Sequence, residues 1–155
     1  MGKKHSIIVF TGGYSGEAAI SRKSAHMVMK HIDLDRFQPT LVHINEDGWF
    51  IDTEGQRRPT SLEHLMADAA GYIGAFVMVH GTPGEDGKLQ AQLAASGFPH
   101  TTGSAEAMAL TFHKGRTSEL LRSHGIAVAR SYQIPHEGSW KASEIIESLG
   151  LPCFV

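Results

Sequence analysis

Two short stretches of this sequence combine glycine with residues that can contact a charged ligand. The first, "TGGYSGE" at residues 11–17, ends in Glu17, and the second, "HGTPGEDGKLQAQL" at residues 80–93, begins with His80. Each follows an apolar run and precedes a segment with helical periodicity. A helix N-terminus offers unpaired amide groups and a partial positive charge, and glycine lets a ligand approach the backbone. Both turns are therefore candidate ligand-binding sites.

Neither turn matches a standard phosphate-binding motif. A dinucleotide fingerprint needs Gly-x-Gly-x-x-Gly, but here Gly12 and Gly13 are adjacent, and the next acidic residues come before the second predicted strand. A P-loop needs four residues between its glycines and a hydroxyl residue after its lysine. Here five residues separate Gly81 from Gly87, and Leu89 takes the hydroxyl position.

The charged side chains of the two turns each have two interpretations. Glu17 lies at the first turn of a predicted helix, where a carboxylate either complements the helix dipole or holds a substrate ammonium. His80 ends a buried strand, so it is either an interior histidine or a ligand contact. Adjacent acids rarely aim at one ligand. We therefore interpret Glu85 and Asp86 as caps of the following helix, and Lys88 as an exposed side chain.

Several other classes of protein and site are not supported. The ten histidines are scattered without cysteine partners or a His-Glu-x-x-His pattern, so no metal site is predicted, and no Gly-x-Ser-x-Gly elbow indicates a hydrolase. The net charge of −2 gives no reason to expect a nucleic acid or membrane partner. A single cysteine, Cys153, and the lack of a signal peptide or a long apolar segment predict a cytoplasmic protein.

The two turns are positioned by alternating strands and helices. Strands are predicted at residues 5–11, 39–45, 72–79 and 128–134, helices at 15–32, 61–69, 88–97, 104–125 and 139–150, and a hairpin at 46–59. Ser15 is the predicted N-cap of the first helix. This order predicts an α/β fold, an open, mostly parallel sheet with helices on both faces, in which both turns lie at the carboxyl ends of strands.

The character of the chain changes near residues 101–104. Residues 1–103 are predicted to form an α/β domain, and residues 104–155 the start of an α+β domain, with a helix break near Lys114. Residues 151–155 are typical of the opening of another strand. We therefore expect a truncated chain whose second domain is incomplete.

Three segments together resemble the D-alanine–D-alanine ligases in order and spacing. They are "FTGGYSGEAAIS" (10–21), "HGTPGEDGKLQAQL" (80–93) and "ALTFHKGRTSELLRSHGIAVA" (109–129), and "LGLPCFV" (149–155) fits as well. The resemblance implies an ATP-grasp ligase that joins two D-alanines for peptidoglycan synthesis, using ATP and magnesium through a D-alanyl phosphate. It further implies that residues 1–103 are the substrate-binding domain and that residues 104–155 begin the ATP-grasp central domain.

The resemblance also implies roles for individual residues. Glu17 matches a catalytic glutamate that meets the ammonium of the first D-alanine, and Ile20 matches an apolar position near that substrate's methyl group. His80 matches a histidine beside the substrate carboxylate, and Lys114 a lysine that reaches an ATP phosphate. The magnesium ligands and the phosphate loop are expected beyond residue 155, and a homodimer is expected.

The sequence departs from the family pattern at three places. Ala18 and Ala19 follow the first acid where further acidic or polar residues are common, His113 precedes the nucleotide lysine, and Ala91 replaces a glycine after Gln90. We expect the 155-residue chain alone to lack ligase activity. Two alternatives stay open: an ATP-grasp ligase with a different second substrate, and a non-catalytic α/β module that binds a small molecule or a partner.

Overall fold

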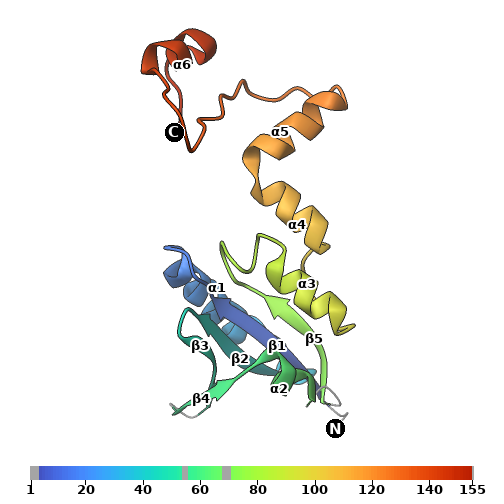
Figure 1. Ribbon diagram of the computed structural model, residues 1–155. Coiled ribbons are helices and arrows are strands. Elements are labelled where there is room, and N and C mark those ends of the chain that lie inside the picture. The colour runs from blue at the N-terminus through green and yellow to red at the C-terminus, as the bar shows by residue number, and fades with distance from the viewer. Residues whose placement is uncertain (1–3, 54–55, 68–70, 155) are drawn as a thin grey trace. The chain divides into compact units, whose positions relative to one another are not determined.

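The computed structural model describes residues 4–53, 56–67 and 71–154 (Figure 1). Its elements, in chain order, are β1 (His5–Gly12), α1 (Ala18–His31), β2 (Phe37–Asn45), β3 (Gly48–Thr53), β4 (Gln56–Thr60), α2 (Leu62–Ala67), β5 (Tyr72–Val77), α3 (Lys88–Ala95), α4 (Ala105–Phe112), α5 (Lys114–Ser123) and α6 (Ala142–Leu149). Within the described ranges, none of these helices combines the length and the apolar composition that a bilayer span requires. The chain divides into two compact units, Met1–Phe112 and His113–Val155, and each is described by itself.

The first unit is built on a five-stranded sheet with the order β4-β3-β2-β1-β5 (Figure 1). The central strand β1 runs parallel to both β2 and β5. The hairpin formed by β3 and β4 extends the sheet from β2 in antiparallel fashion. This confirms the open, mostly parallel sheet and the hairpin predicted from the sequence; residues 54–55 at the hairpin turn lie outside the described residues.

Helices cover both faces of this sheet, as predicted (Figure 1). Side chains alternate between the faces along a strand. On one face of β1, Ile8 and Phe10 are fully buried in the hydrophobic core, which α2 and α3 complete. The members of this core are Ile8, Phe10, Val42, Ile44, Leu65, Ala75, Val77, Val79, Leu89, Leu93 and Phe98. On the opposite face, α1 packs against β1 through the fully buried Ser21 and Ala25.

The face that α1 turns to the sheet carries small residues. The larger apolar side chains Ile20 and Met27 are 52% and 54% exposed. The small residues Ser21 and Ala25 are buried instead. Small side chains let a helix backbone lie close to a sheet, and this close approach positions the first turn of α1 beside the end of β1.

The second unit contains α5 and α6, and its described residues contain no strand. The helix predicted at residues 104–125 is interrupted at His113, close to the predicted break. The strands predicted at residues 128–134 and 151–155 are wrong for the described residues. A strand needs a hydrogen-bonded neighbour, and residues 129–134 lie exposed instead, with Arg130 donating to the Ser148 and Leu149 carbonyls at the end of α6.

Candidate functional site

The two glycine-containing turns meet at the carboxyl ends of β1 and β5. A Cβ atom at Gly81 would lie 2.5 Å from Ser15 Oγ and 3.9 Å from Glu17 Oε2. Gly81 also has a φ of +68°, a conformation that favours glycine. The Glu17 carboxylate therefore lies against the turn that begins at His80. In open α/β sheets, ligands bind at this edge.

Backbone hydrogen bonds join the first turn to its neighbours. The Tyr14 amide donates to the Thr82 carbonyl at 2.9 Å, and the Gly13 amide donates to the Ile44 carbonyl at 2.8 Å. Ser15 Oγ donates to the His80 carbonyl at 3.3 Å and accepts from the Glu17 amide at 3.2 Å. Ser15 is therefore not the N-cap of α1, a position that Glu17 takes. Its hydroxyl instead connects the two turns.

Ser21 is a buried polar residue whose contacts were not predicted from the sequence. Its Oγ accepts from the Gly12 amide at 2.8 Å, donates to the Met78 carbonyl at 2.7 Å, and lies 3.1 Å from Thr11 Oγ1. One hydroxyl thus holds the ends of β1 and β5 to α1. The available signal was a small polar residue one turn into a helix that follows a glycine-containing turn.

The second turn is held by its own acidic residues. Glu85 Oε2 accepts from the Gly81 amide at 2.7 Å, and the Glu85 amide donates to the Gly81 carbonyl at 2.8 Å. Glu85 therefore closes the turn on itself and does not cap α3, which corrects the expectation for this residue. Asp86 Oδ1 does accept from the Lys88 amide at the start of α3, at 3.2 Å.

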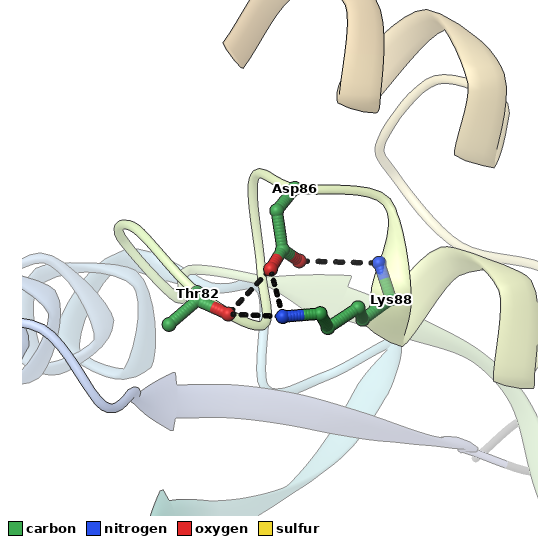
Figure 2. Close-up of polar contacts among 3 residues, drawn as sticks. All are labelled: Thr82, Asp86 and Lys88. Carbon is green, nitrogen blue, oxygen red and sulfur yellow. Dashed lines mark hydrogen bonds and ion pairs between the residues drawn. The ribbon is translucent and has the colours of Figure 1, made fainter. Parts of the chain in front are cut away.

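Asp86 also lies in a small polar network (Figure 2). The Thr82 hydroxyl donates to Asp86 Oδ2, and Lys88 Nζ lies 2.9 Å from the same oxygen. Burial of the Asp86 carboxyl raises its pKa, but the hydrogen bonds from Thr82 and Lys88 and the lysine charge outweigh burial and lower the pKa overall. Lys88, 69% exposed, is thus an ion-pair partner and not only a surface side chain.

The predicted site residues fall into the two units of the chain. Glu17 and Ile20 lie one helical turn apart at the start of α1, both exposed, and His80 is partly buried in the facing turn. Lys114 is the first residue of α5 in the second unit, where the His113 side chain accepts from the Arg116 amide and caps the helix. The structure thus brings Glu17, Ile20 and His80 to one sheet edge and places Lys114 elsewhere in the chain.

Lys114 lines a hollow within the second unit. Its volume is about 350 Å³, and it is lined by Lys114, Gly115, Ser118, Glu119, Arg122, Ser131, Tyr132 and Gln133. Lys114 and Arg122 give this hollow two cationic side chains, opposed by the carboxylate of Glu119. Cationic and hydroxyl side chains are the groups that bind phosphate.

Among the described residues, no three His, Cys, Asp or Glu side chains gather as metal ligands do.

A larger open hollow of about 1000 Å³ lies between β3, α2 and α3. Tyr14 borders it, but its lining contains neither Glu17 nor His80. The hollow therefore reaches the first turn only through Tyr14.

Comparison with known proteins identifies the family. The family model for the D-ala D-ala ligase N-terminus matches residues 6–104. The chain belongs to the D-alanine–D-alanine ligase family. This confirms the resemblance found in the three sequence segments. The matched range contains both turns of the candidate site, whereas Lys114 lies beyond it.

Relatives from curated collections match over almost the whole chain. A D-alanine–D-alanine ligase of Christiangramia forsetii is 37% identical over 157 residues, which are 98% of this chain and 48% of the relative. A D-alanine–D-alanine ligase of Flavobacterium johnsoniae is 32% identical and covers 97% of this chain and 48% of its own length. The chain therefore spans about half the length of the curated relatives that it matches.

Solved structures share the fold. The D-alanine–D-alanine ligase of Coxiella burnetii superposes with a TM-score of 0.76 at 24% identity, covering 94% of this chain and 49% of that one. The D-alanine–D-alanine ligase of Bacillus anthracis complexed with ATP gives a TM-score of 0.72 at 20% identity, covering 94% and 43%. At these identities the likeness establishes the fold, which agrees with the sheet and helices described above.

Proposed function

We propose that this chain is the amino-terminal part of an ATP-dependent ligase that joins two D-alanines through a D-alanyl phosphate. The observation that carries the proposal is the family match over residues 6–104, within which the Glu17 and His80 turns meet at one sheet edge. The proposed product supplies peptidoglycan synthesis in the cytoplasm. The whole protein is proposed to act as a homodimer.

Each site residue of the first unit has a proposed task toward the first D-alanine. The Glu17 carboxylate, exposed at the N-terminus of α1, pairs with the substrate ammonium. Ile20, 52% exposed one helical turn away, contacts the substrate methyl group. His80 lies in the facing turn and donates to the substrate carboxylate. Together these contacts orient the carboxylate that receives the phosphoryl group.

Lys114 is proposed to contact an ATP phosphate. Its place on a hollow with Arg122 and Ser118 supports this role, because such side chains neutralise and donate to phosphate oxygens. Magnesium has no comparable support within this chain, since no three ligand side chains gather in the described ranges.

The proposal is tested with a chimaera. Residues 1–155 are joined to the carboxy-terminal half of the Christiangramia forsetii ligase, and phosphate release is measured with ATP and D-alanine. We expect turnover from the chimaera and none from the 155-residue chain alone.

The variant Glu17→Gln ties the activity to the proposed site. It keeps the shape of the side chain but removes the charge that pairs with ammonium, so we expect the KM for the first D-alanine to rise by about tenfold or more. Arg36→Gln, at an exposed position between α1 and β2, is the matched control and should leave KM unchanged. A folded chimaera without turnover, or one indifferent to Glu17→Gln, contradicts the proposal.

A further inference from the structure

Gln90 is a fully buried polar residue near the start of α3. Its Nε2 donates to the Gly84 carbonyl at 2.6 Å and to Thr102 Oγ1 at 3.0 Å. Its Oε1 is buried and has no hydrogen-bond partner among the described residues. The side chain therefore acts through its donor nitrogen, and a carbonyl as first partner fixes the orientation of the amide.

The first partner lies inside the turn that begins at His80. Gly84 is buried, and a Cβ atom there would overlap the Val79 carbonyl oxygen and side chain. The turn is closed by the paired hydrogen bonds between Gly81 and Glu85. Because the backbone is so tightly placed, a donor held against the Gly84 carbonyl restrains the whole turn.

The second partner belongs to a segment that runs beside β5. The Ala75 amide donates to the Pro99 carbonyl at 2.8 Å, and the Thr101 amide donates to the Ala75 carbonyl at 3.1 Å. The Val77 amide donates to Thr101 Oγ1 at 3.1 Å. This segment leads directly into α4, so Gln90 joins the His80 turn to the segment that enters the next helix.

A second contact closes the same connection. A Cβ atom at Gly87, whose φ is +86°, would overlap the carbonyl oxygen of Ala105, the first residue of α4. The turn thus contacts the 99–105 segment at two places, through the Gln90 amide and through the Gly87 backbone. Of these two contacts, the Gln90 amide is the one that a side-chain substitution can remove without adding bulk.

We propose that Gln90 is a positioning residue: its buried amide fixes the turn that carries His80 against the segment leading into α4, and so sets where His80 lies. The role of Gln90 in placing the turn follows from its hydrogen bonds to Gly84 and Thr102. The consequence for substrate binding rests, in addition, on the proposed function.

The placement is tested on the 155-residue chain by amide hydrogen exchange at Gly81 and Glu85. Gln90→Met keeps the length of the side chain but removes the donor, so we expect protection of these amides to fall by about tenfold. The same substitution at the exposed Gln92, two residues along α3, is the control and should leave protection unchanged. Unchanged protection in Gln90→Met overturns the proposal.

Gln90→Glu distinguishes a hydrogen-bonding role of this side chain from a role in packing alone. A protonated carboxyl donates to the Gly84 carbonyl, whereas the carboxylate only accepts and is repelled by it. We expect protection of the Gly81 and Glu85 amides to be lost at about pH 9 and partly regained at about pH 5, relative to Gln92→Glu at the same pH values. The proposal is also overturned if the protection of the Gly81 and Glu85 amides in Gln90→Glu does not change with pH.

A gentler variant covers the case in which buried substitutions at Gln90 unfold the chain. Thr102→Val removes the second acceptor, on a partly buried residue, together with the 3.0 Å contact between Thr102 Oγ1 and His100 Nδ1. We expect protection at Gly81 and Glu85 to fall, though less than in Gln90→Met, because the turn loses its anchor on the 99–102 segment. Protection that stays at the wild-type level in Thr102→Val counts against the coupling.

The consequence for substrate is measured on the chimaera described above. Gln90→Met should raise the KM for the first D-alanine and leave kcat nearly unchanged, because it displaces a binding residue and not the reacting groups. An inactive parent chimaera counts against the proposed ligase function, whereas the exchange results decide the role of Gln90 separately. A fall in kcat with an unchanged KM contradicts a positioning role toward His80.

Discussion

At the scale of single residues, His43 links the fold of the first unit to pH. It lies half-buried on β2. Burial lowers its pKa from the usual 6.5, the Asp52 carboxylate raises it, and the Arg57 and Arg22 charges lower it further. The net effect favours the neutral imidazole in the folded chain.

The sign of the resulting stability change follows from proton uptake. As pH falls below about 6.5, the unfolded chain binds a proton at this histidine before the folded chain does, so the free energy of unfolding decreases. His43→Gln removes this contribution. We expect urea unfolding between about pH 7.5 and pH 5.5 to show a shallower decrease in stability for His43→Gln than for wild type.

The other histidines supply the control for this comparison. His64→Gln, at an exposed position on α2, is the control variant. A His43→Gln variant whose stability falls with acid as steeply as that of wild type would show that this imidazole is not the group responsible.

At the scale of elements, the attachment of α1 to the sheet depends on Ser21. Its hydroxyl contacts the Thr11 hydroxyl, the Gly12 amide and the Met78 carbonyl, all at the end of β1 or just after β5. Ser21→Ala leaves these buried groups short of a partner, so we expect the free energy of unfolding to fall by about 1–3 kcal/mol. Urea denaturation followed by circular dichroism measures it.

Ser24 offers a matched control on the same helix. It is only partly buried, and Ser24→Ala should change the free energy of unfolding by less than about 0.5 kcal/mol. Equal effects of the two substitutions would mean that helix propensity, and not the Ser21 contacts, determines the outcome.

The elements of the first unit were largely predictable from the sequence, and the reasons are local. Continuous apolar runs gave β1 and β5, and the turn residues between residues 46 and 59 gave the hairpin. The face of α1 was not predictable in the same way, because two neighbouring stripes of the helix have similar spacing. Close packing selected the stripe with Ser21 and Ala25 over the one with Ile20 and Met27.

The candidate site, too, was predictable from the sequence only in part. Glycine spacing and strand order predicted that Glu17 and His80 would lie at one sheet edge. The partners of Ser15, Ser21, Glu85 and Gln90 were not predictable, because each depends on backbone carbonyls and amides whose positions are set by the assembled turns. Residues 128–134 were mispredicted because residues such as Val128, Tyr132 and Ile134 form a strand only where a neighbour is present to pair with it.

At the scale of the whole molecule, the two units differ in how much they bury. Among described residues, every buried side chain lies at or before Phe98, and the second unit has none. Residues 126–141 form neither helix nor strand and include Arg130 and Lys141. Exposed irregular segments are preferred sites of proteolysis.

Limited trypsin digestion should therefore cut first at Arg130 or Lys141, among the sites in the described part of the chain. Mass spectrometry of early fragments identifies the cut. The double variant Arg130→Gln with Lys141→Gln should lose this early cleavage while the first unit stays intact. A first cut at Arg57, on the exposed strand β4, would contradict the expected order of stability.

The glycines around the site also define where its chemistry can be changed. A Cβ atom at Gly12 would overlap the Ile44 carbonyl, and Gly84 and Gly87 are equally enclosed by the carbonyls of Val79 and Ala105. Residues other than glycine are not accommodated at these positions, whichever ligand is sought. A library that seeks a new specificity should vary exposed positions such as Glu17 and Ile20, since the backbone at these three glycines leaves no room for a side chain.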